Sequence, residues 1–343
     1  MKILVAGNYK NEIYARALEE AFMKLGYDTI KFDWFSYFSN QTIMQRFQFK
    51  YHIGPLINKI NQDLVELVRK QKPDLVFIYR GILIKGDAIK RIKALGAKVI
   101  GYNNDDPFDG KYAKYVWKIF LDGVENYDFV YSFRVKNLLD YQKRGISSEL
   151  LRIYYIRERN YPIEVLSDNK YKCDIMFIGH YENDGRDEMI ISLFRRGYNI
   201  KLYGHAWENS KYYAELKSFM SGDIVTLSDD YNLAMNSCKI ALSFLSKLNN
   251  DTYTTRCFEI PATKTFLLCE RSEDMESMFL PDEEAVYFSS FEEMLKKIDY
   301  YLLHTEEREK IACAGYNRLM RDGHEVQDRC KQIIEKYYKL ERM

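Results

Sequence analysis

Short apolar runs alternate with segments that carry apolar residues at helical spacing along the first half of the chain. The run at residues 2–6 is closed by Gly7, a helical pattern follows over residues 11–25, and a second apolar run covers residues 28–34. This order of strand, helix and strand is typical of a doubly wound parallel sheet. The predicted strands of this half are 2–6, 28–34, 73–79, 97–102, 129–133 and 151–156, and its predicted helices are 11–25, 56–70, 86–95 and 135–143.

The polar segment 157–172 interrupts this alternation and predicts a linker. A second alternating series follows it. We therefore predict two α/β domains, residues 1–157 and residues 173–322, and a C-terminal helix in residues 323–343 that could cross back to the first domain. The predicted strands of the second half are 174–178, 200–203, 224–227, 239–244 and 265–269, and its predicted helices are 187–196, 211–220, 231–237, 291–303, 305–320 and 326–340.

The predicted fold class is α/β, with two Rossmann-like doubly wound domains that face a central cleft. In such sheets ligands bind outside the carboxyl ends of the strands, so the informative residues should directly follow strands. The first of these loops, GNYKNE, holds one glycine, so the Gly-x-Gly-x-x-Gly dinucleotide fingerprint is absent there.

Length and charge narrow the classes of function. A chain of 343 residues suits two domains. Its 51 lysines and arginines almost cancel 50 aspartates and glutamates, so no basic excess favours nucleic acid as a partner. No apolar run approaches the length of a transmembrane helix, and the N-terminus begins with a strand instead of a signal peptide. We therefore expect a cytoplasmic protein without a transmembrane segment.

Cysteines and histidines predict no metal site. The six cysteines form no Cys-x-x-Cys pair, which favours buried free thiols in a reducing compartment. The five histidines lack the spacings of a zinc site. We expect neither a metal nor another cofactor.

The stretch 251–269 is the strongest candidate for chemistry, since it predicts a loop, a short helix and a buried strand. If residues 253–263 are helical, Arg256 and Glu259 lie three positions apart on one face. A guanidinium suits phosphate oxygens because its planar fork donates several hydrogen bonds, and a carboxylate can accept from a ribose diol. The pair therefore suits a nucleoside diphosphate, although an ion pair on a helix surface gives the same spacing.

The run TTRCFEIPATKTFLLCERSEDMESMF, residues 254–279, resembles the C-terminal half of the CgeB-like (spore maturation protein) glycosyltransferases of the GT-B superfamily. Their pattern Ser-Arg-x-Phe-Glu is matched here from Thr255 to Glu259. Glu259 also falls where retaining GT-B enzymes carry the second Glu of their Glu-x7-Glu motif. Asp251 replaces the first Glu, and Lys264 stands where the family usually has Gly.

The resemblance implies a glycosyltransferase that moves a sugar from a nucleotide-sugar donor, more often UDP-linked than GDP-linked, with retention. Arg186 and Arg256 would neutralise the diphosphate in place of a metal, and Glu259 would hold the ribose. Asp251 would also belong to the donor site. The acceptor would be a glycan, a lipid-linked sugar or a protein, as in surface-polysaccharide assembly at the inner face of the membrane. Peripheral membrane contact fits this role, although no basic amphipathic helix requires it.

Glycines that follow strands complete the predicted donor site. Gly179 precedes Arg186 in a run similar to that of the family, and Gly204 begins a family-like Gly-x-x-Trp run. Gly7 follows the first strand, where GT-B proteins approach the donor phosphate or the acceptor. Structural explanations also exist: Arg186 as a solvent-exposed helix residue, Gly204 as part of a turn beside a buried Trp, and Tyr9, which follows Gly7, as a packing residue.

Asp105 and Asp106 are the predicted catalytic residues. They lie directly after the strand 97–102, in an Asp-Asp-Pro turn that the family also carries. Carboxylates at a strand end can position an acceptor or remove a proton from its hydroxyl. Asp and Asn also favour turns that cap a following helix, and both explanations can hold together.

Two other functions compete with transfer. A GT-B sugar-nucleotide epimerase would need acid and base groups around the sugar, and the sequence shows no distinct set. A non-catalytic sugar-binding, nucleotide-binding or coat-associated protein of the same fold is the other alternative. The departures at Asp251 and Lys264 leave that second alternative open.

Overall fold

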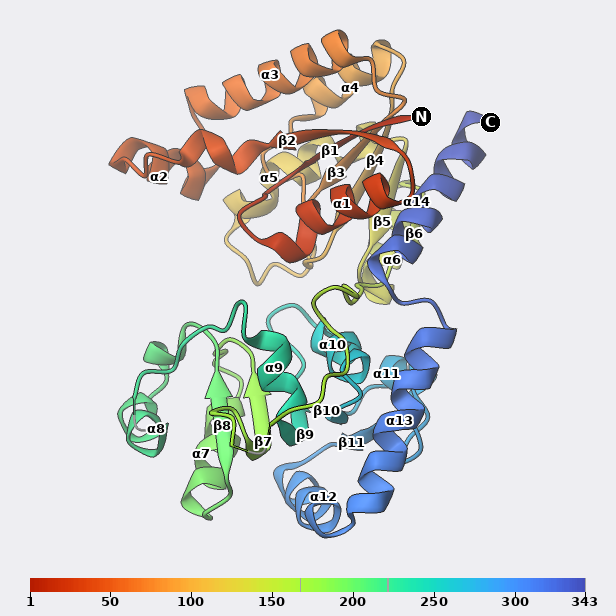
Figure 1. Ribbon diagram of the computed structural model, residues 1–343. Coiled ribbons are helices and arrows are strands. Elements are labelled where there is room, and N and C mark those ends of the chain that lie inside the picture. Colours follow the sequence, from red (N-terminus) through yellow and green to blue (C-terminus); the bar gives the residue numbers. More distant parts are fainter. Residues whose placement is uncertain (167, 221, 343) are drawn as a thin grey trace. The chain divides into compact units, whose positions relative to one another are not determined.

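A computed structural model describes residues 1–166, 168–220 and 222–342, which divide into two compact units (Figure 1). The first unit is Met1–Arg152 together with Val326–Met343, and the second is Ile153–Glu325. The predicted boundaries lie at 157, 173 and 322. The two doubly wound α/β units confirm the predicted fold class.

The first unit holds a six-stranded parallel sheet in the order β2-β1-β3-β4-β5-β6. Its inner strands are buried on both faces because helices cover each side, which explains their almost continuous apolar sequences. The strands are β1 (Lys2–Gly7), β2 (Asp28–Asp33), β3 (Leu75–Tyr79), β4 (Lys98–Asn103), β5 (Phe129–Ser132) and β6 (Ser148–Leu150). The helices are η1 (Glu12–Arg16), α1 (Ala17–Lys24), η2 (Trp34–Phe38), α2 (Ile43–Tyr51), α3 (Pro55–Gln71), α4 (Gly86–Ala94), α5 (Lys114–Gly123), η3 (Val124–Asn126), α6 (Val135–Lys143) and α14 (Val326–Glu341).

The second unit holds a five-stranded parallel sheet in the order β11-β10-β9-β7-β8. Its strands are β7 (Cys173–Ile178), β8 (Ile200–Tyr203), β9 (Cys238–Ser243), β10 (Phe266–Glu270) and β11 (Val286–Phe288). Its helices are α7 (Arg186–Arg195), η4 (Trp207–Asn209), α8 (Tyr213–Met220), α9 (Tyr231–Asn236), α10 (Arg256–Ala262), α11 (Glu273–Met278), α12 (Phe291–Leu303) and α13 (Thr305–Arg321).

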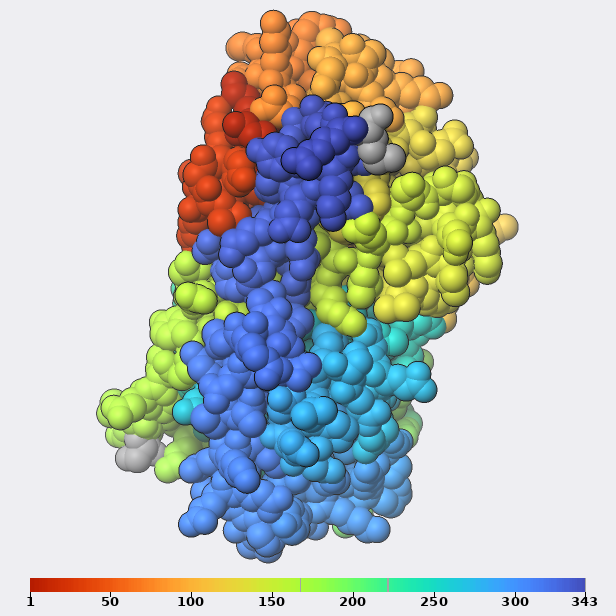
Figure 2. All heavy atoms as spheres, turned by 90° about the vertical axis from the view of Figure 1, so that its right-hand side faces the viewer, coloured from red at the N-terminus to blue at the C-terminus, as the bar shows by residue number. Residues whose placement is uncertain are grey.

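The C-terminal helix α14 belongs to the first unit, where it packs against α1. The Tyr131 hydroxyl donates to the carbonyl of Gln332 over 3.1 Å, and Arg329 donates through Nε to the carbonyl of Arg152 over 2.8 Å. Figure 2 shows α14, in dark blue, lying against the red N-terminal segment. A helix of the first unit is therefore supplied by residues that follow the second unit in the sequence.

Two predicted strands are absent from the structure, and one observed strand was not predicted. Residues 151–156 were predicted as the sixth strand, but the paired strand is β6, and the apolar side chains after it are buried in irregular chain. Residues 224–227 form no strand, and Val225 is half exposed. β11 pairs with β10 instead, in a segment where the sequence pattern predicted none.

The predicted linker 157–172 belongs to the second unit instead of joining two bodies freely. The backbone N–H of Tyr161 donates to the Asn232 side chain over 3.1 Å, and that of Ile163 donates to Asn236 over 3.0 Å. Its polar composition reflects an irregular segment bound along α9. No helix of the described residues is both long and apolar enough to cross a membrane.

Candidate functional site

Two glycines bring the loops after β7 and β8 together at the carboxyl edge of the second sheet. Gly204 has a φ of +147°, and a Cβ there would lie 1.9 Å from the carbonyl oxygen of Gly179. The buried Trp207 donates through its indole N–H to that same oxygen over 2.9 Å. Gly204 therefore permits a close backbone contact, and Trp207 forms part of the packed turn that the sequence analysis considered as one alternative.

Arg256 lies in the first turn of α10, beside the last residue of β7. Its Nε donates to the carbonyl of Ile178 over 2.6 Å, and its Nη1 donates to the Glu259 carboxylate. Its guanidinium carbon also lies 4.7 Å from the centre of the Tyr231 ring. These contacts hold the guanidinium at the strand end, while 27% of the side chain stays exposed.

Glu259 is oriented by two donors on one oxygen. Its Oε2 accepts from Arg256 and from the Tyr231 hydroxyl, the latter over 2.8 Å. Within the described part of the chain, Oε1 has no hydrogen-bond partner, although the residue is only 5% exposed. The predicted sharing of one helix face is thus confirmed as an ion pair, and one carboxylate oxygen remains able to accept a hydrogen bond.

Tyr231 was missed by the sequence analysis. It begins α9, and burial raises the pKa of its hydroxyl well above the ordinary value, so the hydroxyl is a hydrogen-bond donor at neutral pH. It lies 28 residues before Glu259 in the sequence. No local motif links the two positions, because only the sheet order brings α9 beside α10.

Arg186 is placed differently from Arg256. Its side chain is 4% exposed and donates to both oxygens of Asp184, through Nε over 2.9 Å and through Nη2 over 2.7 Å. Its Nη1 donates to the carbonyl of His180 over 2.9 Å. Arg186 therefore fixes the loop between β7 and α7 from inside, which differs from the exposed helix residue that was the structural alternative.

Two histidines accompany the two glycines. His180 follows Gly179 and His205 follows Gly204, and their rings stack with centroids 5.2 Å apart. His180 also bonds the Glu182 carboxylate over 2.8 Å. Burial and the neighbouring His180 lower the pKa of His205, which favours its neutral form at pH 7. A Gly-His dipeptide after each of two neighbouring strands was the sequence signal for this pair.

Asp251 lies in the loop between β9 and α10 and is half-buried. Its backbone N–H donates to the carbonyl of Ser246 over 2.9 Å. It therefore belongs to the same loop region that leads into the helix of Arg256 and Glu259.

In the first unit, Gly7 ends β1 where the chain turns toward η1. A Cβ at this position would lie 2.5 Å from the Cβ of Ala15 and 3.3 Å from that of Tyr79. Its small size is therefore required for packing. Tyr9 is also buried and donates to the carbonyl of Val5 over 3.2 Å.

Asp105 follows β4 and forms an ion pair with Arg80, which follows the neighbouring β3, with 2.7 Å between Oδ2 and Nη2. Arg80 has a φ of +49°, a conformation that is unfavourable for a residue with a side chain. Its guanidinium also lies 5.5 Å from the Trp117 ring. The carboxyl ends of two adjacent strands thus present a partly exposed cation and a carboxylate.

Asp106 is fully buried, unlike Asp105. Its Oδ1 accepts from Asn137 over 2.8 Å and from the backbone N–H of Phe108 over 3.0 Å, and its Oδ2 accepts from Lys136 over 2.8 Å. Burial alone would lower the pKa of Lys136, but the ion pair with Asp106 raises it. This carboxylate ties the turn to α6, so its placement agrees with a structural role and not with contact to an acceptor.

A cavity of about 240 Å³ is bordered by this turn, and Asp106 and Pro107 are among its lining residues. It is lined by aromatic and small residues, among them Phe108, Tyr112 and Trp117. Aromatic side chains of this kind can pack against a sugar ring. Among the described residues, no group of three or more His, Cys, Asp and Glu side chains is arranged to hold a metal.

Residues 186–335 match the family model described as Glycosyl transferase-like. This match contains Arg256 and Glu259 but excludes residues 1–185, and with them Gly179. A search of curated proteins gave no match.

Solved structures resemble the whole chain. Sucrose-phosphate synthase from Thermosynechococcus elongatus is 11% identical, with a TM-score of 0.69 over 99% of this chain and 98% of that chain. Anabaena HepE in complex with UDP-glucose is 10% identical, with a TM-score of 0.70 over 99% and 100%. UDP-GlcNAc 2-epimerase from Neisseria meningitidis, bound to UDP-GlcNAc, is 12% identical, with a TM-score of 0.56 over 99% and 100%. The chain therefore has the fold of the GT-B glycosyltransferases, and residues 186–335 match a glycosyl transferase-like family.

Proposed function

We propose that this protein is a glycosyltransferase that transfers a hexose from a UDP-sugar, without a metal and with retention of the anomeric configuration. The observation that carries the proposal is the anchored guanidinium of Arg256, which lies at the carboxyl end of β7 beside Glu259. The family match and the fold support the same class. The pattern at residues 255–259 further favours the CgeB-like enzymes and a role in cytoplasmic assembly of surface polysaccharide.

Arg256 would act on the leaving group. When the glycosidic bond breaks, negative charge grows on the diphosphate, and a fixed cation lowers the energy of that transition state. The bonds to Ile178 and Glu259 hold the guanidinium before the ligand arrives, so little ordering is needed on binding.

Glu259 would recognise the ribose. Its Oε2 is occupied by Arg256 and Tyr231, while Oε1 can accept from a ribose hydroxyl. Gly179 and Gly204 would let the nucleotide approach the backbone, and Asp251 would lie beside the donor. Gly7 would support the corresponding strand end in the first unit.

The acceptor would bind the first unit near Asp105. This carboxylate is paired with Arg80 but is partly exposed, so it can orient an acceptor hydroxyl. Asp106 would only hold the turn, since its oxygens already accept from three donors. The acceptor would be a glycan, a lipid-linked sugar or a protein, approached where needed through peripheral membrane contact.

A sugar-nucleotide epimerase is the second candidate, favoured by one specific arrangement. His180, Glu182 and His205 form a titratable group beside Gly179. Such groups can exchange protons with a bound sugar. Incubation with UDP-GlcNAc separates the candidates, because an epimerase would form the C2 epimer without any acceptor.

Calorimetry in the presence of EDTA tests the donor site, with UDP, GDP and CMP compared at equal concentrations. We expect UDP to bind the unaltered protein. We expect this binding to be lost in the variants Arg256→Ala and Glu259→Ala. Arg195→Ala is the matched control, because Arg195 forms an exposed ion pair with Glu215 on the same unit. Failure of every nucleotide to bind would contradict the proposal and favour a non-catalytic protein of this fold. If UDP binds, the configuration of the sugar in the product then tests retention.

A further inference from the structure

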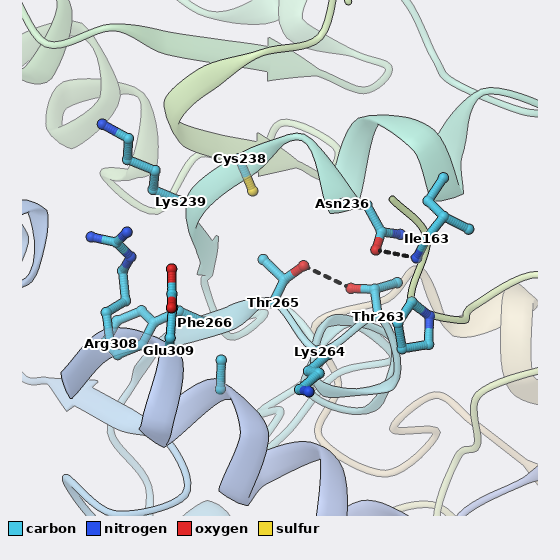
Figure 3. A pocket seen from close by; sticks show the side chains of 12 residues that line it. Ile163, Asn236, Cys238, Lys239, Thr263, Lys264, Thr265, Phe266, Arg308 and Glu309 are labelled. Atoms are coloured by element: carbon cyan, nitrogen blue, oxygen red, sulfur yellow. Dashed lines mark hydrogen bonds between the residues drawn. The ribbon is translucent and has the colours of Figure 1, made fainter. Parts of the chain in front are cut away.

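A second polar cavity lies in the second unit, at the opposite edge of its sheet from Gly179 and Gly204. Its volume is about 350 Å³, and it is lined at the amino ends of β9 and β10 and by the first turn of α13 (Figure 3). Ligand pockets in proteins range upward from about 300 Å³, so the space suits a small molecule. The donor site proposed above does not use these residues.

Arg308 is the main feature of this cavity. It is 6% exposed, and within the described part of the chain it forms no direct ion pair, although the charges of Glu309 and Asp174 partly offset the lowering of its pKa by burial. Its partners are the carbonyl of Tyr301, 2.5 Å from Nη1, and the hydroxyl of Thr305, 3.5 Å from Nη2. A buried cation is costly unless an anion or enough hydrogen bonds compensate it. Two neutral oxygens, one of them distant, compensate it only in part, so the site favours an anion.

Other lining side chains extend the positive charge. Lys239 lies near Arg308 in Figure 3 and pairs with Asp174 over 2.7 Å, and Lys264 lies on another side of the cavity. Glu309 is the one carboxylate among the lining residues, all of which the structure describes. Three cations and one carboxylate therefore line the space, an arrangement that suits an anionic ligand with some neutral polar groups.

Lys264 has an unfavourable backbone conformation for its residue type. Its φ is +58°, in the left-handed region where glycine is the favoured residue, and it ends the turn after α10. This position is the one at which the resembling family usually carries Gly. The chain thus keeps a long cationic side chain at the cavity wall where a glycine would be easier to accommodate.

We propose that this cavity binds a small sugar phosphate, with the phosphate against Arg308 and Lys239. A guanidinium recognises phosphate oxygens through parallel hydrogen bonds, which a buried site strengthens. Sugar hydroxyls would donate to Glu309, and Lys264 would close the other side of the site. This proposal is independent of the donor site and of transferase activity.

Calorimetry on the full chain with glucose 1-phosphate, inorganic phosphate and glucose as separate probes tests the proposal. We expect glucose 1-phosphate to bind best, inorganic phosphate to bind more weakly and glucose not to bind. Arg308→Gln should lower the affinity for glucose 1-phosphate by about ten- to a hundredfold, which is the range for the loss of a hydrogen bond to a charged group. Lys310→Gln, an exposed change on the same helix, should leave binding unchanged.

Lys264→Gly is a second variant, which tests the same cavity if the Arg308→Gln variant does not fold. Glycine suits the positive φ, so the melting temperature should not fall, whereas binding of glucose 1-phosphate should weaken. Absence of binding by both phosphate compounds would overturn the proposal. Binding that survives Arg308→Gln and Lys264→Gly but disappears in Arg256→Ala would also overturn it, because the ligand would then occupy the donor site. Equal binding of inorganic phosphate and glucose 1-phosphate would overturn the assignment to a sugar phosphate.

Discussion

Arg186 and Arg256 both lie near the carboxyl end of β7, and the resemblance predicts that both neutralise the donor diphosphate. The surroundings of the two side chains differ. Arg186 is 4% exposed, and its donors are directed at Asp184 and the carbonyl of His180 within its own loop. Arg256 is 27% exposed and is held from behind by Ile178 and Glu259. One arginine is enclosed by its loop, whereas the other is anchored and still accessible.

This difference indicates which of the two arginines can bind a phosphate group. An arginine saturated by a buried carboxylate can reach a phosphate only by breaking that pair, which is strongly unfavourable in a buried setting. An arginine anchored by a backbone carbonyl keeps its direction, and part of the Arg256 side chain stays exposed to a ligand. We therefore expect Arg186 to control stability and Arg256 to control binding.

The largest effect should follow from Arg186→Ala. The change leaves the buried Asp184 carboxylate without its main partner, so the free energy of unfolding should fall by about 3–5 kcal/mol. For a domain of this size that corresponds to a fall of roughly 10 °C in the melting temperature, measured by calorimetry or circular dichroism. The double variant Asp184→Asn with Arg186→Ala should recover part of the loss, because it removes the unpaired charge. A variant that melts like the unaltered protein but loses UDP binding would assign Arg186 to the ligand instead.

Arg256→Ala should give the second effect, on catalysis. The loss of one preorganised group at a developing charge typically costs about 10²–10³ in rate, so kcat/KM for the UDP-sugar should fall by about that factor. Arg256→Lys keeps the charge but loses the planar fork, and should recover only part of the activity. The melting temperature should fall less than in Arg186→Ala, because Glu259 keeps its hydrogen bond from the Tyr231 hydroxyl. Equal activity of Arg256→Ala and the Arg195→Ala control would remove Arg256 from the proposed site.

The fold could be predicted because its signals are local. Buried parallel strands have continuous apolar sequences, and β1, β3 and β7 are almost uninterrupted runs of such residues. The strand expected at residues 151–156 shows the limit of this reasoning, since burial without sheet pairing gives the same apolar pattern. The short β11 contains three residues, too few for a period to be recognised.

The site was predictable only where its residues are neighbours in the sequence. Arg256 and Glu259 share one helical turn, so their spacing indicated the pair. The saturation of Arg186 and the contact of Tyr231 with Glu259 depend on tertiary packing. Likewise, Asp105 and Asp106 are adjacent in the sequence, yet one forms an ion pair with the partly exposed Arg80 and the other is fully buried.

Tyr231→Phe should have a smaller effect on UDP binding than Arg256→Ala, and it tests whether Tyr231 acts on Glu259 or on Arg256. The change removes the 2.8 Å hydrogen bond to Glu259 but keeps the ring beneath the guanidinium. A hydrogen bond to a charged group contributes about 1.5–3 kcal/mol, so UDP affinity should fall by about ten- to a hundredfold if this bond orients Glu259 for the ribose. Uridine without phosphate should lose affinity by the same factor, since the lost contact concerns the ribose side. If only the affinity for UDP falls, while that for uridine does not, Tyr231 would instead orient the guanidinium of Arg256.

The smallest effect should be a dependence of stability on pH in the loop of Arg186. Burial would raise the pKa of the Glu182 carboxyl, but the hydrogen bond from His180 and the charge of Arg186 outweigh burial and hold the pKa below its ordinary value. A carboxyl with a lowered folded-state pKa stabilises the fold above its unfolded pKa, about 4.3, and this contribution is lost as the pH falls through the folded value. The difference in unfolding free energy between the unaltered protein and Glu182→Gln should therefore shrink from about pH 5.5 to about pH 3.5 in urea titrations. Glu306→Gln, a change at an exposed position of the same unit, is the control. Parallel curves for the unaltered protein and Glu182→Gln would mean that this carboxyl is not held by the loop, and the contrast between an enclosed Arg186 and an accessible Arg256 would then rest on Asp184 alone.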